Sequence, residues 1–108
     1  MSESETEKRN VTTYIMFSKL TERGRDRVRT HPERILEVNN EVEMRGCRVV
    51  AQYAMMGDYD FVTIIEAPDN GEMSRIAIEL GARGTIDTTT YTAIPIDEFI
   101  DIMHGNGA

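Results

Sequence analysis

The sequence predicts an α+β domain in which strands and helices follow one another in the order βαββαβ. Four runs rich in apolar, β-branched or aromatic residues have the length and composition of strands. Two intervening segments carry apolar residues three or four positions apart, which is the spacing of one buried helix face. The middle two strands are separated only by a short turn containing glycine and aspartate, so they form an antiparallel hairpin.

The composition indicates one small, acidic domain. With 108 residues and 40% hydrophobic content, the chain can bury a modest core but no cofactor chamber of its own, and we expect no cofactor. The net charge of -7 repels phosphate groups, which argues against nucleic acid or an anionic membrane as a partner. Excess acidic residues and scarce lysine indicate a salt-rich cytoplasm or a GC-rich genome.

The expected domain boundaries and location follow from local composition. Residues 1–10 are polar and are expected to form a mobile tail, residues 11–104 one folded domain, and residues 105–108 a frayed end. The single Cys47 allows no internal disulfide. No apolar stretch approaches the roughly 20 residues of a membrane-spanning helix or forms a signal peptide. We therefore expect a cytoplasmic protein.

The first strand is expected over residues 11–18. Its alternation places Tyr14 and Met16 on one face and Ile15 and Phe17 on the other. Because both faces are apolar, two layers must cover the sheet, and two helices on one side supply only one of them.

Two helical segments are expected after this strand. Thr21 can cap a short helical turn that runs to Arg29. A longer helix is expected over residues 32–45, because proline is tolerated in a first helical turn and Glu33 suits the positive end of the helix dipole. Gly46 then supplies the left-handed residue that ends helices. One apolar face of the longer helix consists of Ile35, Leu36, Val38 and Val42.

The central hairpin is expected to join strands 47–56 and 61–67 through the turn Gly57–Asp60. Glycine permits the positive φ of a tight turn, and aspartate bonds nearby backbone amides. A bulge near Met55 and Met56 would shift the alternation of the second strand by one residue and exchange its two faces. The inward face of this strand is therefore left open.

The last elements repeat the pattern of helix and strand. Asp69 or Asn70 can cap a helix that Gly81 and Gly84 end, with Met73, Ile76, Ala77 and Leu80 on its buried face.

A fourth strand, residues 85–94, is rich in threonine, tyrosine and isoleucine and ends at Pro95. A short closing helix over residues 96–103 follows. The order of elements is the ferredoxin-like plan.

Several short motifs together resemble those of the GYD domain family, which is named for a Gly-x-Tyr-Asp turn. The chain has Gly57-Asp58-Tyr59-Asp60 at this turn, and the resemblance extends over about residues 12–103. Further likenesses are Thr13-Tyr14-Ile15-Met16, Lys19-Leu20-Thr21, Pro32-Glu33-Arg34, Gln52-Tyr53 and Glu66-Ala67-Pro68-Asp69.

The resemblance implies a dimeric α+β barrel in which two ferredoxin-like sheets face each other. It provides no catalytic residues to carry over. Related barrels include cofactor-free oxygenases, haem-handling enzymes and ligand-sensing modules, so an activity would rest on fold-level analogy alone.

The turn offers the first candidate ligand-binding residues. Tyr59 could donate its phenol to a polar ligand, and Asp60 could act as a base. The alternative, which we favour, is that Asp60 bonds turn amides and Tyr59 packs over a sheet edge.

Tyrosines within the strands are the second group of candidates. Tyr14, Tyr53 and Tyr91 lie in three different strands, and those that share an inward face could line a pocket between facing sheets. Tyr14 and Tyr53 are the favoured ligand contacts, and core or interface packing is the alternative.

His31 lies next to Pro32, at the start of the longer predicted helix. It could be a proton shuttle, a metal ligand or an axial haem ligand, but a capping or surface role is favoured. No spacing of histidine, cysteine and carboxylate residues predicts a metal site. Cys47 lacks a neighbouring base and is expected to be structural.

Alternating arginines precede the long helix. On a helix they spread around the axis and cannot all face one groove, which favours a solvated surface or intersubunit salt bridges over an RNA site. They are Arg23, Arg25, Arg27 and Arg29.

The sequence therefore favours a non-catalytic, homo-oligomeric module that binds a small ligand or acts as a scaffold. A cofactor-independent oxygenase or isomerase is the first alternative, and it requires a polar-lined cavity between facing sheets. An effector-sensing regulatory subunit is the second. We assign no catalytic residue.

Overall fold

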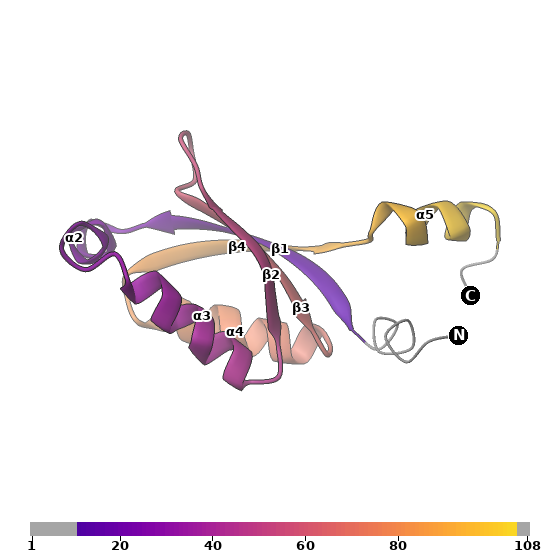
Figure 1. Ribbon diagram of the computed structural model, residues 1–108, viewed down its shortest axis with the longest axis horizontal. Helices are drawn as coiled ribbons and strands as arrows, with labels where there is room; N and C mark the ends of the chain where they lie inside the picture. Colours follow the sequence, from indigo (N-terminus) through magenta and orange to yellow (C-terminus); the bar gives the residue numbers. More distant parts are fainter. Residues whose placement is uncertain (1–10, 106–108) are drawn as a thin grey trace.

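The computed structural model describes residues 11–105, and Figure 1 shows how their elements are arranged. The order is βααββαβα. The elements are β1 (Thr12–Leu20), α2 (Glu22–Thr30), α3 (Arg34–Met44), β2 (Arg48–Ala54), β3 (Phe61–Ala67), α4 (Asn70–Ala82), β4 (Ile86–Ala93) and α5 (Ile96–Met103). The tail expected over residues 1–10 and the end from 106 onward lie outside the described residues.

The four strands form one antiparallel sheet in the order β2-β3-β1-β4. α3 and α4 lie on the same side of this sheet, while α2 and α5 lie at opposite ends of the molecule (Figure 1). This arrangement confirms the predicted ferredoxin-like α+β fold. One face of the sheet is covered by helices, and within residues 11–105 no helix covers the other.

Side-chain caps fix where two helices begin. The Thr21 hydroxyl accepts a hydrogen bond from the Gly24 amide at 3.1 Å, and Asp69 accepts one from the Glu72 amide at 2.8 Å. Thr21 also donates its own amide to the Thr85 carbonyl at 3.0 Å, which ties the start of α2 to the start of β4. Both predicted caps are confirmed.

Glycine ends helices at the predicted places, with one correction. Gly46 and Gly84 have φ values of 84° and 78°, in the left-handed region that glycine tolerates. Gly81 was expected to end α4, but it lies inside the helix. The long helix α3 begins at Arg34, because Pro32 and Glu33 form a preceding turn.

The register of β2 is irregular at Val50. Val49 pairs with Ile65, whereas Ala51 pairs with the next residue back along β3, Ile64. The irregularity therefore lies earlier than the bulge considered near Met55. From Ala51 onward it places Tyr53 on the face of the sheet that lacks helices.

The core lies between the sheet and the helices. Its buried side chains come from alternate positions of β1 and β3, from one face of α3 and α4, and from the residue just before β2. They are Tyr14, Met16, Val42, Cys47, Ile65, Ala67, Met73, Ile76 and Leu80. The predicted inward faces are confirmed at Val42 of α3 and at Met73, Ile76 and Leu80 of α4, whereas Leu36, predicted on the buried face of α3, is 65% exposed.

Candidate functional site

The predicted ligand-contacting turn serves a structural role through Asp60. The Asp60 carboxylate accepts a hydrogen bond from the Leu20 amide at 2.7 Å, and its own amide donates to the Ser18 carbonyl at 2.8 Å. The Asp60 carbonyl closes the hairpin by accepting from the Met55 amide at 2.7 Å. These bonds fasten the hairpin to the end of β1, as the favoured interpretation of the turn predicted.

Tyr59 packs on a cluster of rings on the helix-free side of the sheet. Its ring centroid lies 5.1 Å from that of Phe17, which in turn lies 5.9 Å from Tyr91 in an edge-to-face arrangement. Tyr53 is on the same side and is 61% exposed. Three of the tyrosines therefore gather on one face.

The cross-strand pairs define this surface, which we call the open sheet face. One row runs Ala51, Ile64, Ile15 and Tyr91 across all four strands, and the next runs Tyr53, Val62, Phe17 and Thr89. These positions alternate with the buried Tyr14 and Met16, so they point away from the helices. The face is largely apolar and has no cover within residues 11–105.

Charged pairs border the open sheet face at both ends of its strands. Arg48 lies opposite Glu66 with an ion pair of 3.3 Å, and Lys19 lies opposite Asp87. An apolar centre with a polar rim is the usual composition of a protein interface.

The closing helix α5 adds further exposed apolar surface. It is an eight-residue helix with no buried residue, and Figure 1 shows it projecting from the end of the sheet. Its exposed apolar side chains are Ile96, Phe99, Ile100, Ile102 and Met103. Within residues 11–105, no helix combines the length and apolarity needed to cross a bilayer.

Tyr14 and Tyr53, the two favoured ligand contacts, lie on opposite faces of the sheet and therefore cannot share a pocket. Tyr14 is 3% exposed, and its hydroxyl donates to Asn70 Oδ1. Together with Thr90 it lines a pocket of about 320 Å³ beside α4. The Thr90 hydroxyl is buried there without a hydrogen-bond partner.

His31 lies on the surface between α2 and α3. Its ring nitrogens are 3.3 Å from a Glu37 oxygen and 3.6 Å from a Glu33 oxygen. Hydrogen bonds from Arg34 and then from His31 lower the pKa of the Glu37 carboxyl. Among residues 11–105, no group of three or more histidine, cysteine and acidic residues is placed to hold a metal ion.

Cys47 is buried at the start of β2. Burial, reinforced by the negative charge of Glu72, raises the pKa of its thiol. A thiol that stays protonated is a poor nucleophile, which agrees with its expected structural role.

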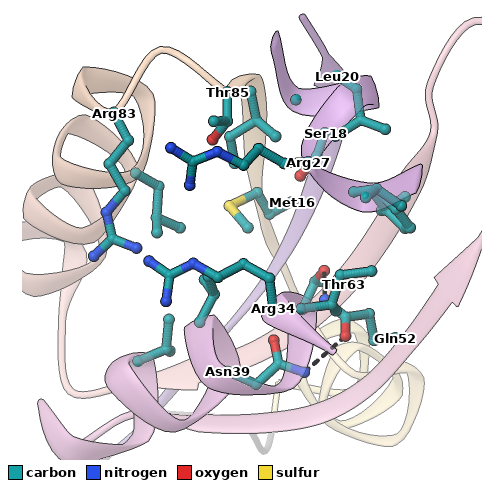
Figure 2. A pocket seen from close by; sticks show the side chains of 18 of the residues that line it. Met16, Ser18, Leu20, Arg27, Arg34, Asn39, Gln52, Thr63, Arg83 and Thr85 are labelled. Atoms are coloured by element: carbon teal, nitrogen blue, oxygen red, sulfur yellow. Dashed lines mark hydrogen bonds between the residues drawn. The ribbon is translucent and has the colours of Figure 1, made fainter. Parts of the chain in front are cut away.

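A pocket that the sequence did not predict lies between the helices and the covered face of the sheet. We call it the arginine pocket, because Arg23, Arg27, Arg34 and Arg83 line it, and its volume is about 560 Å³. Figure 2 shows Arg27, Arg34 and Arg83 around the side chain of Met16. None of the predicted site residues lines this pocket.

The sequence contained only part of the signal for the arginine pocket. Arg23 and Arg27 are one turn apart, so they share a side of α2. Arg25, which lies between them in the sequence, is on another side of the helix. Arg34 and Arg83 join the first two only through the packing of α2, α3 and the end of α4. The spacing of residues along the chain does not predict how these helices pack against one another.

Similar proteins include a curated relative and two solved structures. A Thermus thermophilus protein named "Glutamine synthetase and cystathionine beta-lyase binding protein" is 46% identical over 89 residues, which cover 82% of this chain and 94% of the relative. The crystal structure of MtbAldR matches with a TM-score of 0.60 at 19% identity, over 78% of this chain and 52% of that one. TTHA0845 from Thermus thermophilus matches with a TM-score of 0.50 at 17% identity, over 78% of this chain and 94% of that one. The two structural matches support the fold alone.

A family model fixes the relationship suggested by the Gly-Asp-Tyr-Asp turn. The model of the GYD domain matches residues 14–103, from the third residue of β1 to the last residue of α5. The chain belongs to the GYD domain family.

Proposed function

We propose that this protein is a non-catalytic module that self-associates through its open sheet face and, as an assembly, binds metabolic enzymes. The observation that carries the proposal is the apolar surface of the open sheet face, which has no cover within residues 11–105. Monomeric proteins rarely expose a large contiguous apolar patch, and such patches usually mark interaction sites.

The arrangement of charge around the face supports a protein partner. Apolar rows through Ile15 and Phe17 form the centre, and the pairs Arg48 with Glu66 and Lys19 with Asp87 lie at the edges. A second copy of the same face brings apolar rows against apolar rows. Its mixed-sign rim supplies charges of both signs for pairing with the other rim.

The closing helix supports the same proposal. An isolated helix of eight residues is unstable in water unless its apolar side packs on something. α5 has no buried residue in its own subunit, and its large apolar side chains Phe99 and Ile100 are 43% and 47% exposed. Its apolar side therefore lacks a packing partner within residues 11–105. We propose that α5 packs on the partner subunit and extends the interface beyond the sheet.

The relative at 46% identity supports enzyme binding as the further role. Its name states that it binds glutamine synthetase and cystathionine β-lyase, and the match covers 94% of it. We extend both partners to this protein as a proposal.

We also propose the cytoplasmic location expected from the sequence. A single cysteine cannot form an internal disulfide, and cytoplasmic proteins rarely contain disulfides.

The enzyme-binding role can be tested by mixing the protein with purified glutamine synthetase and, separately, with purified cystathionine β-lyase from the same organism. Native mass spectrometry of each mixture should show a complex of defined stoichiometry. The same measurement with an unrelated acidic protein of similar size is the control. Free components alone, in both mixtures, would contradict the proposed partners.

A further inference from the structure

The lining of the arginine pocket is largely apolar. Met16, Ile65 and Leu80 line it, and each is at most 5% exposed. A volume of about 560 Å³ lies within the range of small-molecule sites. The pocket lies on the helix-covered side of the sheet, so it is separate from the open sheet face.

Three polar side chains that line the pocket, Asn39, Gln52 and Thr63, are hydrogen-bonded to one another. The Asn39 amide donates to Gln52 Oε1 at 2.7 Å, and Gln52 Nε2 donates to the Thr63 hydroxyl at 3.0 Å (Figure 2). A ligand therefore finds its main unpaired polar contacts at the mouth, where the arginines lie. This distribution suits a molecule that is apolar along its body and polar at one end.

The mouth carries an excess of positive charge. Arg34 pairs with Glu37 at 2.8 Å, and Glu41 pairs with Arg83. Within residues 11–105, neither Arg23 nor Arg27 forms an ion pair.

The mouth thus has four guanidinium groups but only two paired carboxylates, those of Glu37 and Glu41. It is locally positive, although the whole chain has a net charge of -7. Figure 2 shows that the guanidinium groups of Arg27, Arg34 and Arg83 point toward the same region. Like charges that converge repel one another, and an anion placed between them removes this cost.

We propose that the arginine pocket binds an amphipathic carboxylate, a molecule with an apolar body and one carboxylate head. The apolar body lies against Met16, Ile65 and Leu80, and the head accepts hydrogen bonds from Arg27 and Arg34 at the mouth. Guanidinium groups match the planar geometry of a carboxylate and bind it through paired hydrogen bonds. The site is independent of the proposed self-association.

Isothermal titration calorimetry with decanoate tests this proposal on the full chain. We expect one decanoate per subunit. Arg27→Gln should weaken binding about tenfold or more, because it removes a charge-assisted hydrogen bond. Arg29→Gln is the matched control on the same helix, because Arg29 lies outside the pocket and pairs with Asp26. It should change the affinity less than about twofold.

Two further ligands test the contributions of the carboxylate head and the apolar body to the affinity separately. Decanol keeps the chain and lacks the charge, whereas acetate keeps the charge and lacks the chain. Each should bind at least about tenfold more weakly than decanoate, because each loses one of the two contributions.

Three results would overturn the proposal. They are no binding of decanoate, equal binding of acetate, or an equal loss of affinity in the Arg27 and Arg29 variants. A change of subunit count in Arg27→Gln, with no decanoate binding to the unmodified protein, would instead assign the mouth to a protein contact. The affinity for decanoate and the subunit count are separate measurements, so this proposal and the proposed function can fail independently.

Discussion

At the scale of single residues, Asp60 shows how one side chain can hold a turn in place. Its carboxylate accepts the amide hydrogen of Leu20, which is the last residue of β1. The bond is part-buried, so removal of the carboxylate leaves the Leu20 amide without its partner at a site only partly open to water, where an unsatisfied donor is costly.

Asp60→Ala should therefore lower the free energy of unfolding by about 1–3 kcal/mol. Urea unfolding followed by circular dichroism measures this change. Asp58→Ala is the control in the same turn, because Asp58 is exposed, and it should stay within about 0.5 kcal/mol of the unmodified protein. Equal stability of the two variants would show that Asp60 does not anchor the hairpin.

Cys47 should react slowly with iodoacetamide in the folded protein and rapidly in denaturant. Burial raises the pKa of its thiol, so the reactive thiolate is scarce at neutral pH. The folded state therefore favours the protonated thiol. This contribution to stability is complete below the thiol pKa of the unfolded chain and is lost as the pH rises through the folded-state value.

The mass shift of the alkylated protein, followed over time with and without denaturant, measures the reactivity of Cys47. Similar rates in the two conditions would mean that the thiol is accessible and activated.

Some residue roles could be predicted from the sequence because their causes are local. The bonding of Asp60 follows from the turn chemistry of aspartate, and the expectation that Cys47 is inert rests on the lack of a neighbouring base. The arginine pocket could not be predicted, because Arg34 at the start of α3 and Arg83 at the end of α4 meet the arginines of α2 only through the packing of the helices. The side taken by Tyr53 depended on the irregularity at Val50, which no turn residue marks.

At the scale of elements, the packing of α2 depends on Gly24. A Cβ atom at this position would lie 2.0 Å from the Thr85 carbonyl oxygen, so the helix and the start of β4 would have to move apart. This contact also positions α2, whose Arg23 and Arg27 line the arginine pocket.

Alanine substitutions at two helical glycines should have opposite effects. Gly24→Ala should lower the free energy of unfolding by about 1–3 kcal/mol, because it overpacks a close backbone contact. Gly81→Ala should raise it by about 0.5–1 kcal/mol, because nothing lies within 4 Å of the added carbon and alanine favours helix. Urea unfolding distinguishes the two, and changes of the same sign would contradict the packing described here.

Removal of α5 tests its proposed position on a partner. A chain that ends at Pro95 loses no buried residue of α5, so its circular dichroism should keep the α+β signal. Its self-association should be weaker than that of the full chain. Loss of the fold on truncation would show that α5 stabilises its own subunit.

Most elements could be predicted because their signals lie within a few residues. The strand Phe61–Ala67 and the helix Ile96–Met103 have the predicted bounds. Gly81 was the exception, because glycine in a helix interior is disfavoured but tolerated when neighbouring packing holds the helix. Only the glycine at 84 has the left-handed backbone that ends α4.

At the scale of the whole molecule, the sheet has one covered face and one apolar face without a cover in residues 11–105. The sequence predicted this imbalance, since β1 is apolar on both sides and two helices on one face cover only one of them. The sequence could not specify what covers the second face, because a sheet face carries no information about its partner beyond its own chemistry.

A charge on the open sheet face should disrupt self-association without unfolding the subunit. Tyr53→Glu places a carboxylate where 61% of the side chain is exposed, so its cost to the folded monomer is small. Burying that carboxylate in an interface without a partner is costly. Ile78→Glu is the matched control, because Ile78 is 73% exposed on α4 at the helix-covered side.

Sedimentation velocity over a wide dilution series, on the unmodified protein and these two variants, tests the central claim most directly. We predict that the unmodified protein and Ile78→Glu sediment as the same oligomer, and that Tyr53→Glu dissociates toward a folded monomer. A stable monomer of the unmodified protein at every concentration would contradict the account. So would an oligomer that Tyr53→Glu leaves unchanged.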